Sequence, residues 1–180
     1  MRAFLGIGLT DEVADAVERL QAMLPVGRIV PRENLHLTLA FLDDQPEERL
    51  EELHYELEAI RAAPFEIAFT GLGTFGGDAP RVIFADVAVS APLAELQRRV
   101  TSAARRVGIA PEARRFHPHV TMARLRSGAG NAARVGAFLA DHGRAVLPTL
   151  PVTAFALYQS VLRPEGAQYD ELAQYALIPG

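Results

Sequence analysis

Apolar and polar residues alternate along some stretches of the chain and recur at helical intervals along others. The alternation over residues 3–9 predicts a strand, and the helical spacing of apolar residues over 11–24 predicts a helix with Thr10 as its N-cap. A second strand is expected from about residue 35. A second helix is expected over 46–62, because acidic residues and a proline precede its apolar positions.

The remaining two thirds of the chain continue this mixture of strands and helices. Strands are expected near 65–71, 81–87, 154–161 and 168–178, and helices are expected over 92–107 and 131–141. One more strand is expected directly after the helix at 131–141. The glycine-rich residues 71–77 lack the Lys-Ser/Thr ending of a phosphate loop, so we interpret them as a flexible hairpin connection. Because no regular parallel crossover is indicated, the predicted fold class is α+β with antiparallel pairing.

One seven-residue pattern occurs twice, as HLTLAFL over 36–42 and as HVTMARL over 119–125. Both copies have His, Thr, Ala and Leu at the same offsets. Side chains two residues apart in a strand share one face and lie about 7 Å apart, so each copy presents an imidazole beside a hydroxyl. A single His-x-Thr in an alternating strand is usually structural, but the duplication favours paired acid–base chemistry.

The two copies begin 83 residues apart, close to half of the 180-residue chain. The order strand, helix, motif strand, helix, strand occurs twice. This repetition predicts a single domain over 1–180 that arose by internal duplication, with two pseudo-symmetric lobes. We expect antiparallel sheets to line a central cleft, helices to cover the outside, and a pseudo-twofold axis to place His36 opposite His119.

Composition removes several classes of protein. The chain has 180 residues, of which 49% are hydrophobic, so one well-buried domain is expected. It contains no cysteine, which excludes disulfides, thiolate metal ligands and thiol nucleophiles. No apolar run approaches the roughly 20 residues of a membrane span, and residues 1–9 are too short for a signal segment. We expect no membrane association and a cytoplasmic protein.

The formal net charge of −4 argues against a general nucleic-acid coat. All 18 basic residues are arginines, and many of them gather around the second motif, whereas acidic residues crowd the first third. A biased genome would explain the arginine usage without any function. The guanidinium group also suits phosphate recognition, and the clustering supports that interpretation.

Hydrolysis of a phosphodiester needs a base on the water, an acid on the leaving oxygen and donors to the remaining phosphate oxygens. His36 and His119 are the candidates for the acid and the base, and the hydroxyls of Thr38 and Thr121 are candidate phosphate ligands. Two facing motifs therefore supply every group that this chemistry requires.

At these residues the chain resembles the bacterial and archaeal RNA 2',3'-cyclic phosphodiesterases, historically called 2'-5' RNA ligases, of the two-histidine phosphoesterase superfamily. The resemblance spans nearly the whole chain. Besides the two motifs, it rests on residues 33–39, 80–84, 116–121 and 166–169. One departure is Phe84, where tryptophan is expected in many relatives.

The resemblance implies a two-lobed α+β fold and the hydrolysis of an RNA 2',3'-cyclic phosphate to a 2'-phosphomonoester. Reversible 2'-5' ligation of tRNA half-molecules is implied as a side activity. By this resemblance, His36 corresponds to the family's proton donor to the departing O3', and His119 corresponds to the proton acceptor that activates water. Thr38 and Thr121 resemble the ligands of the phosphate oxygens.

Other residues near the second motif are weaker candidates. His117 and His119 have the same-face spacing of a metal-ligand pair, but no third ligand is apparent, and the acid–base scheme needs no metal. Arg124 lies five residues after His119, an odd offset that places it on the opposite face unless a bulge or the strand end intervenes. Arg114 and Arg115 precede the motif strand in an expected loop, where they are placed to meet an RNA backbone.

Two alternatives remain open. The same chemistry could act on a small cyclic nucleotide, for which the arginine cluster would be superfluous. The cleft could instead bind RNA ends without turnover, although binding alone does not require two titratable imidazoles. On the favoured interpretation the partner is RNA with a 2',3'-cyclic phosphate end, such as tRNA halves. No cofactor is indicated, and the expected oligomeric state is a monomer.

Overall fold

The computed structural model describes residues 1–112, 115–126, 131–164 and 166–180. Its helices are α1 (Asp11–Gln21), α2 (Glu47–Glu58), α3 (Ala91–Arg106) and α4 (Asn131–His142), with one 3-10 turn at Arg32–Asn34. Its strands are β1 (Arg2–Gly8), β2 (Arg28–Ile29), β3 (His36–Asp44), β4 (Phe65–Ile67), β5 (Phe69–Phe75), β6 (Val82–Val87), β7 (His119–Arg124), β8 (Leu150–Val152), β9 (Ala154–Arg163) and β10 (Gly166–Ala176). Within the described residues, no helix is long and apolar enough to cross a bilayer.

Antiparallel pairing joins eight of the strands into one sheet in the order β10-β9-β1-β3-β7-β6-β5, with β2 beside β7. A separate two-stranded sheet contains β4 and β8. The predicted α+β class with antiparallel pairing is confirmed. The two halves do not form separate sheets, however, because β3 and β7 join them through the single residue pair Leu37–Val120.

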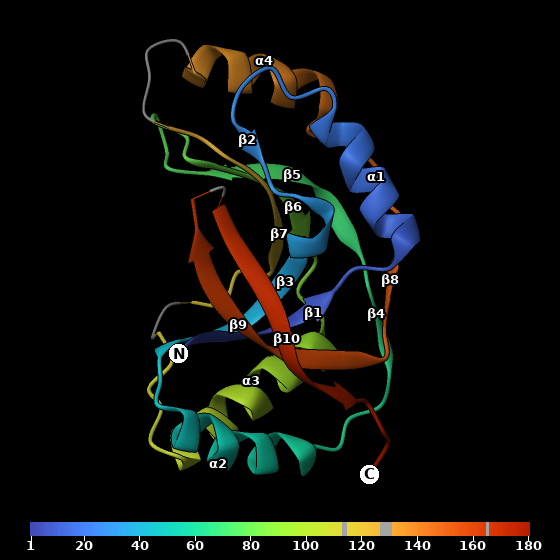
Figure 1. The fold of residues 1–180 in the computed structure, drawn as a ribbon. Helices are drawn as coiled ribbons and strands as arrows, with labels where there is room; N and C mark the ends of the chain where they lie inside the picture. The colour runs from blue at the N-terminus through green and yellow to red at the C-terminus, as the bar shows by residue number, and fades with distance from the viewer. Residues whose placement is uncertain (113–114, 127–130, 165) are drawn as a thin grey trace.

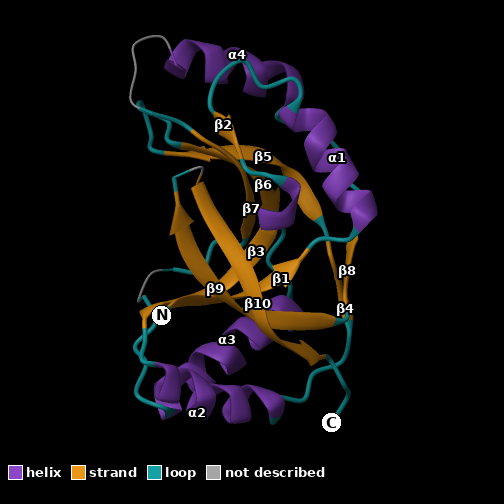
Figure 2. Ribbon diagram, in the orientation of Figure 1, coloured by secondary structure: helices purple, strands orange, loops and turns teal. Residues whose placement is uncertain are grey.

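The helices form two groups at opposite ends of the molecule (Figures 1 and 2). Figures 1 and 2 show α1 and α4 together at one end and α2 and α3 together at the other. The connections cross over: α1 follows β1 but contacts β7, and α3 follows β6 but contacts β3. Leu37 and Val120, which join the halves, are fully buried in the main core. Each motif strand is therefore backed by the helix of the opposite half.

The four predicted helices are present, and the first two are shorter than predicted at their C-termini. The first ends at Gln21 rather than 24, because Met23 and Leu24 make tighter turn bonds to the carbonyls of Leu20 and Gln21. The second ends at Glu58 rather than 62. Thr10 occupies the predicted N-cap position, but its side chain makes no capping hydrogen bond.

The interpretation of residues 71–77 as a flexible hairpin connection is wrong for residues 71–75, although the two strands that it was expected to join do pair as a hairpin. Strand β5 includes most of this segment and pairs with β6, with Gly73 opposite Phe84. The glycine is needed there because the Phe84 ring lies over it: a Cβ on Gly73 would be 2.7 Å from Phe84 Cζ. The chain turns only after the strand, where Gly76 and Gly77 adopt positive φ angles.

Candidate active site

The two motif strands, β3 and β7, are neighbours in the middle of the sheet (Figure 1). Because they are antiparallel and Leu37 pairs with Val120, continuing the register by one residue on each side sets His36 across from Thr121 and Thr38 across from His119. These four side chains, the motif quartet, share one face of the sheet and are all half-buried. The structure thus brings the four sequence-predicted residues together.

Both imidazoles are held in the same way. His36 Nδ1 lies 2.7 Å from the carbonyl oxygen of Asn34, and His119 Nδ1 lies 2.7 Å from that of His117. A carbonyl oxygen only accepts, so Nδ1 carries the hydrogen in each ring and Nε2 is left for chemistry. Nε2 of His36 is 3.0 Å from Thr38 Oγ1. The fold therefore selects one tautomer at both motifs.

A one-residue bulge interrupts each motif strand just after its threonine. The partners of β3 in β1 skip Leu39, and the partners of β7 in β6 skip Met122. Glutamine side chains bind the carbonyls of both skipped residues: Gln97 Nε2 donates to Leu39 O over 3.5 Å, and Gln21 Nε2 donates to Met122 O over 2.9 Å. Helices α3 and α1 thus support equivalent bulges in the two halves.

The bulges bring Phe41 and Arg124 onto the face of the motif quartet. Burial alternates along each strand, reverses phase at the bulge and leaves Phe41 and Arg124 exposed. The bulge that the odd offset of Arg124 required is therefore present. Its guanidinium lies near enough that its charge lowers the pKa of both His36 and His119.

Burial is the main influence on both imidazoles. It lowers the pKa of His36 to about 4; the bond to the Asn34 carbonyl opposes this shift, and the charge of Arg124 adds to it. Burial also lowers the pKa of His119, and the nearby charge of Asp86 opposes that shift. In the free protein both imidazoles are therefore neutral at pH 7.

His117 has a partner that the sequence did not indicate. Its Nε2 lies 2.9 Å from Asp86 Oδ1, and Asp86 pairs with His119 across β6 and β7. The backbone carbonyl of His117 accepts the hydrogen bond from His119. Among the described residues, no group of three or more His, Cys, Asp or Glu side chains is placed to hold a metal ion. His117 and Asp86 thus line the site as a hydrogen-bonded pair next to His119.

Asn34 connects His36 to the C-terminal hairpin of β9 and β10. Its backbone carbonyl holds the imidazole, while its buried side chain donates from Nδ2 to Ala167 O over 2.6 Å. The ring of Tyr169, also in β10, meets the His36 ring edge-on at 5.1 Å. Sequence reasoning missed this support, because backbone partners leave no signal in residue spacing.

Two cavities border the quartet. The larger, of about 870 Å³, is lined by Thr38, Phe41 and His119 together with one side of α3. The smaller, of about 370 Å³, is lined by His36 and Tyr158, among others. Arg115 lines the larger cavity, as its predicted phosphate role requires, whereas Arg114 lies outside the described residues.

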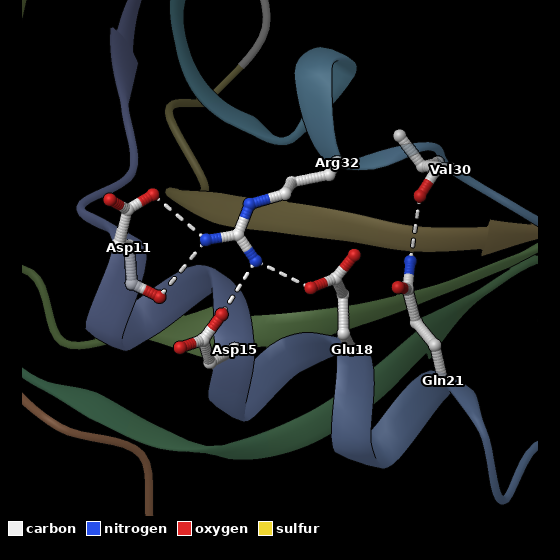
Figure 3. Close-up of polar contacts among 6 residues, drawn as sticks. All are labelled: Asp11, Asp15, Glu18, Gln21, Val30 and Arg32. Carbon is white, nitrogen blue, oxygen red and sulfur yellow. Dashed lines mark hydrogen bonds and ion pairs between the residues drawn. The ribbon is translucent and has the colours of Figure 1, made fainter.

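Carboxylates surround Arg32, which lines the smaller cavity. Figure 3 shows the guanidinium of Arg32 bound by Asp11, Asp15 and Glu18 of α1. Both Arg32 and Asp11 line this cavity. The positive charge of Arg32 is therefore already compensated, so the rim on the His36 side is acidic.

Comparison with known proteins agrees with this geometry. A model of the 2'-5' RNA ligase superfamily matches residues 9–161. The chain belongs to this superfamily. Proteins named RNA 2',3'-cyclic phosphodiesterase are similar to it: one from Aeropyrum pernix is 35% identical over 150 residues, covering 81% of this chain and 83% of that protein. One from Thermus thermophilus is 33% identical over 194 residues, covering 98% and 90%. One from Geobacillus stearothermophilus is 39% identical over 132 residues, but this match spans 42% of that protein.

Solved structures of E. coli LigT have the same fold as this chain. The apo form of E. coli LigT superposes with a TM-score of 0.80 at 28% identity, covering 98% of this chain and 97% of LigT. LigT complexed with 3'-AMP gives a TM-score of 0.76 at 27% identity, covering 98% and 96%. The sequence-based assignment to this family is confirmed.

Proposed function

We propose that the protein hydrolyses 2',3'-cyclic phosphate ends of RNA to 2'-phosphomonoesters by two-histidine acid–base catalysis. The observation that carries the proposal is the motif quartet, in which two imidazoles of one tautomer and two hydroxyls share a face at the junction of two cavities. Family membership and the names of the similar proteins support the substrate class. All four groups come from one chain, so the scheme works in a monomer and requires no cofactor.

In this scheme water attacks the phosphorus atom from the His119 side. Nε2 of His119 takes the water proton as the new P–O bond forms. The P–O3' bond breaks on the other side, and Nε2–H of His36 gives its proton to O3'. Thr38 and Thr121 donate hydrogen bonds to the non-bridging oxygens, whose charge the guanidinium of Arg124 also offsets. The phosphate stays on O2', and the two imidazoles exchange protonation states.

The proton donor needs a charge that the free protein disfavours. Burial lowers the pKa of His36 to about 4, so the imidazole is neutral at pH 7 before substrate binds. A phosphodiester anion in contact with Nε2 favours the imidazolium and raises this pKa. It also compensates the charge of Arg124. The substrate itself thus prepares His36 as the acid.

Ligation follows from the same geometry. An RNA 5'-hydroxyl in place of water gives up its proton to His119, attacks the phosphorus and leaves a 2'-5' linkage when O3' departs. The reverse reaction uses the same two imidazoles with exchanged roles. We therefore include reversible 2'-5' ligation as a side activity.

The products of two parallel incubations test the proposal. Wild-type protein in excess EDTA is incubated with a short oligoribonucleotide that ends in a 2',3'-cyclic phosphate and, separately, with a cyclic mononucleotide. We expect the oligonucleotide to become a 2'-phosphate. Turnover of the mononucleotide alone would favour a small-nucleotide enzyme, and binding of the oligonucleotide without turnover would favour an RNA-end binding protein.

A further inference from the structure

One side of α3 presents a row of polar groups to the larger cavity. The lining residues recur at intervals that keep them on one side of the helix: Gln97, Arg98, Thr101, Ser102 and Arg105. The opposite side of the helix is buried in the core through residues such as Leu96 and Val100. The row therefore lies beside the motif quartet without belonging to it.

The arginines of α3 differ in whether their charge is already compensated. Arg98 and Arg99 both bind Glu95 in the same helix, and Arg106 binds Glu56 of α2. Arg105, which lines the cavity, has no ion pair or hydrogen bond within the described residues. Its guanidinium is thus the one on this helix that is left for an external anion.

Other residues that line this cavity complete a site for a nucleotide. Arg115 also lines it and likewise has no partner within the described part of the chain. Phe41, beside Thr38 on β3, is 49% exposed into the same cavity. A cationic pair with hydroxyls nearby suits a phosphate, and an exposed ring suits a nucleobase, which is the combination that single-stranded nucleic acids require.

The two cavities differ in charge in a way that selects the path of an RNA strand. The smaller cavity has an acidic rim, because the carboxylates of α1 already neutralise Arg32. A phosphate backbone would be repelled there and attracted to the larger cavity, where no carboxylate of the described residues binds Arg105 or Arg115, although Asp86 and Glu112 also line the cavity. The strand therefore leaves the quartet along α3.

We propose that Arg105 and Arg115, with the hydroxyls of Thr101 and Ser102, bind an internal phosphate of the RNA whose cyclic end occupies the motif quartet. This inference rests on the proposed function and adds the substrate class: an oligonucleotide is preferred to a mononucleotide, because only an oligonucleotide has an internal phosphate. Phe41 stacks on a base of the same strand.

The experiment compares Arg105→Ala with Arg106→Ala, two adjacent arginines of one helix of which only the first lines the cavity. For each variant, kcat/KM is measured for a short oligoribonucleotide and for a mononucleotide, both with 2',3'-cyclic phosphates. We expect Arg105→Ala to lower the oligonucleotide-to-mononucleotide ratio of kcat/KM about tenfold, as for loss of one charge-assisted hydrogen bond. Arg106→Ala should leave the ratio at the wild-type value.

Salt dependence gives a second readout. Each lost phosphate contact should make the plot of log kcat/KM against log salt shallower by about 0.7 for the oligonucleotide. Equal ratios and equal slopes for Arg105→Ala and Arg106→Ala would overturn the phosphate site while leaving the proposed function intact. Wild-type protein that turns over neither substrate would overturn the proposed function and, with it, this inference.

Discussion

Phe41 and Arg124 occupy equivalent positions in the two halves of the protein. Each lies five residues after its motif histidine, and each reaches the quartet face because the preceding strand contains a bulge, at Leu39 or at Met122. The same backbone device therefore presents an aromatic ring on one side of the site and a guanidinium on the other.

This relationship predicts the effect of removing the ring. Phe41→Ala should raise KM for an oligoribonucleotide substrate by about five- to 150-fold, because base–aromatic stacking contributes roughly 1–3 kcal/mol. Phe41→Tyr, which keeps the ring, should stay near wild type. The matched control is Tyr55→Ala, since Tyr55 is 70% exposed on α2 and does not line the cavity. The KM of each variant is measured by steady-state kinetics. Equal KM values for Phe41→Ala and Tyr55→Ala would refute the stacking role.

The position of Arg124 shows where sequence reasoning stops. The alternation of side chains in a regular strand correctly groups His119 with Thr121, but it assigns Arg124 to the opposite face. Only the bulge at Met122, which Gln21 supports from another part of the chain, reverses that assignment. Because bulges depend on partners distant in sequence, the short-range pattern alone could not determine it.

The prediction for the glycine-rich segment failed for a related reason. Glycine is common in turns, so residues 71–77 were interpreted as a connection, yet Gly73 lies within β5. Its missing side chain makes room for the Phe84 ring on the neighbouring strand, which in turn contacts the His119 ring at 5.2 Å. Local composition cannot distinguish a glycine required by such a neighbour from one required by a turn.

This contact predicts a destabilising substitution. Gly73→Ala would put a Cβ 2.7 Å from Phe84 Cζ, and the buried ring, packed 4.3 Å from Phe75, has little room to move. We expect the free energy of unfolding to fall by about 1–3 kcal/mol. Urea denaturation measures this value. Gly136→Ala is the control, because nothing lies within 4 Å of a Cβ there in α4, and it should stabilise by roughly 0.5–1 kcal/mol. Unchanged stability of Gly73→Ala would contradict the packing argument.

The lowered pKa values predict pH profiles that differ between the free and the substrate-bound protein. The pH dependence of kcat/KM reports the pKa values of the free protein, and the pH dependence of kcat reports those of the enzyme–substrate complex. Burial lowers the pKa of His36 to about 4 and also lowers that of His119, so the acidic limb of kcat/KM should lie below the ordinary histidine pKa of 6.5. The bound anion favours both imidazolium ions, so the kcat profile should move to higher pH.

Both profiles should be bell-shaped, since one imidazole must be protonated while the other is neutral. The apparent pKa values belong to the coupled pair rather than to one residue. Rates measured across the pH range on one oligonucleotide substrate provide the test. A single sigmoid, or kcat and kcat/KM profiles that coincide, would be inconsistent with the proposed roles.

Internal duplication remains a prediction, although the two halves share more than their motifs. Nδ1 of each histidine binds a carbonyl two residues earlier, and a glutamine binds the carbonyl of each bulge. The sequence shows the repeated motif and its spacing, which was enough to expect two facing histidines. It does not show that Asn34 binds the C-terminal hairpin or that Asp86 binds His117, because those partners lie far apart in the sequence.

Distinct acid and base roles for His36 and His119 are the central claim, and substitution of the leaving atom tests them most directly. The rates of His36→Ala and His119→Ala are compared on a 2',3'-cyclic substrate with O3' and on its analogue with sulfur at that bridging position. Each variant should lose about 10²–10⁴ in rate on the oxygen substrate. A departing thiolate needs no proton, so His36→Ala should recover most of its loss on the sulfur analogue, while His119→Ala should not. Equal losses of both variants on both substrates, or recovery by His119→Ala alone, would contradict the assignment.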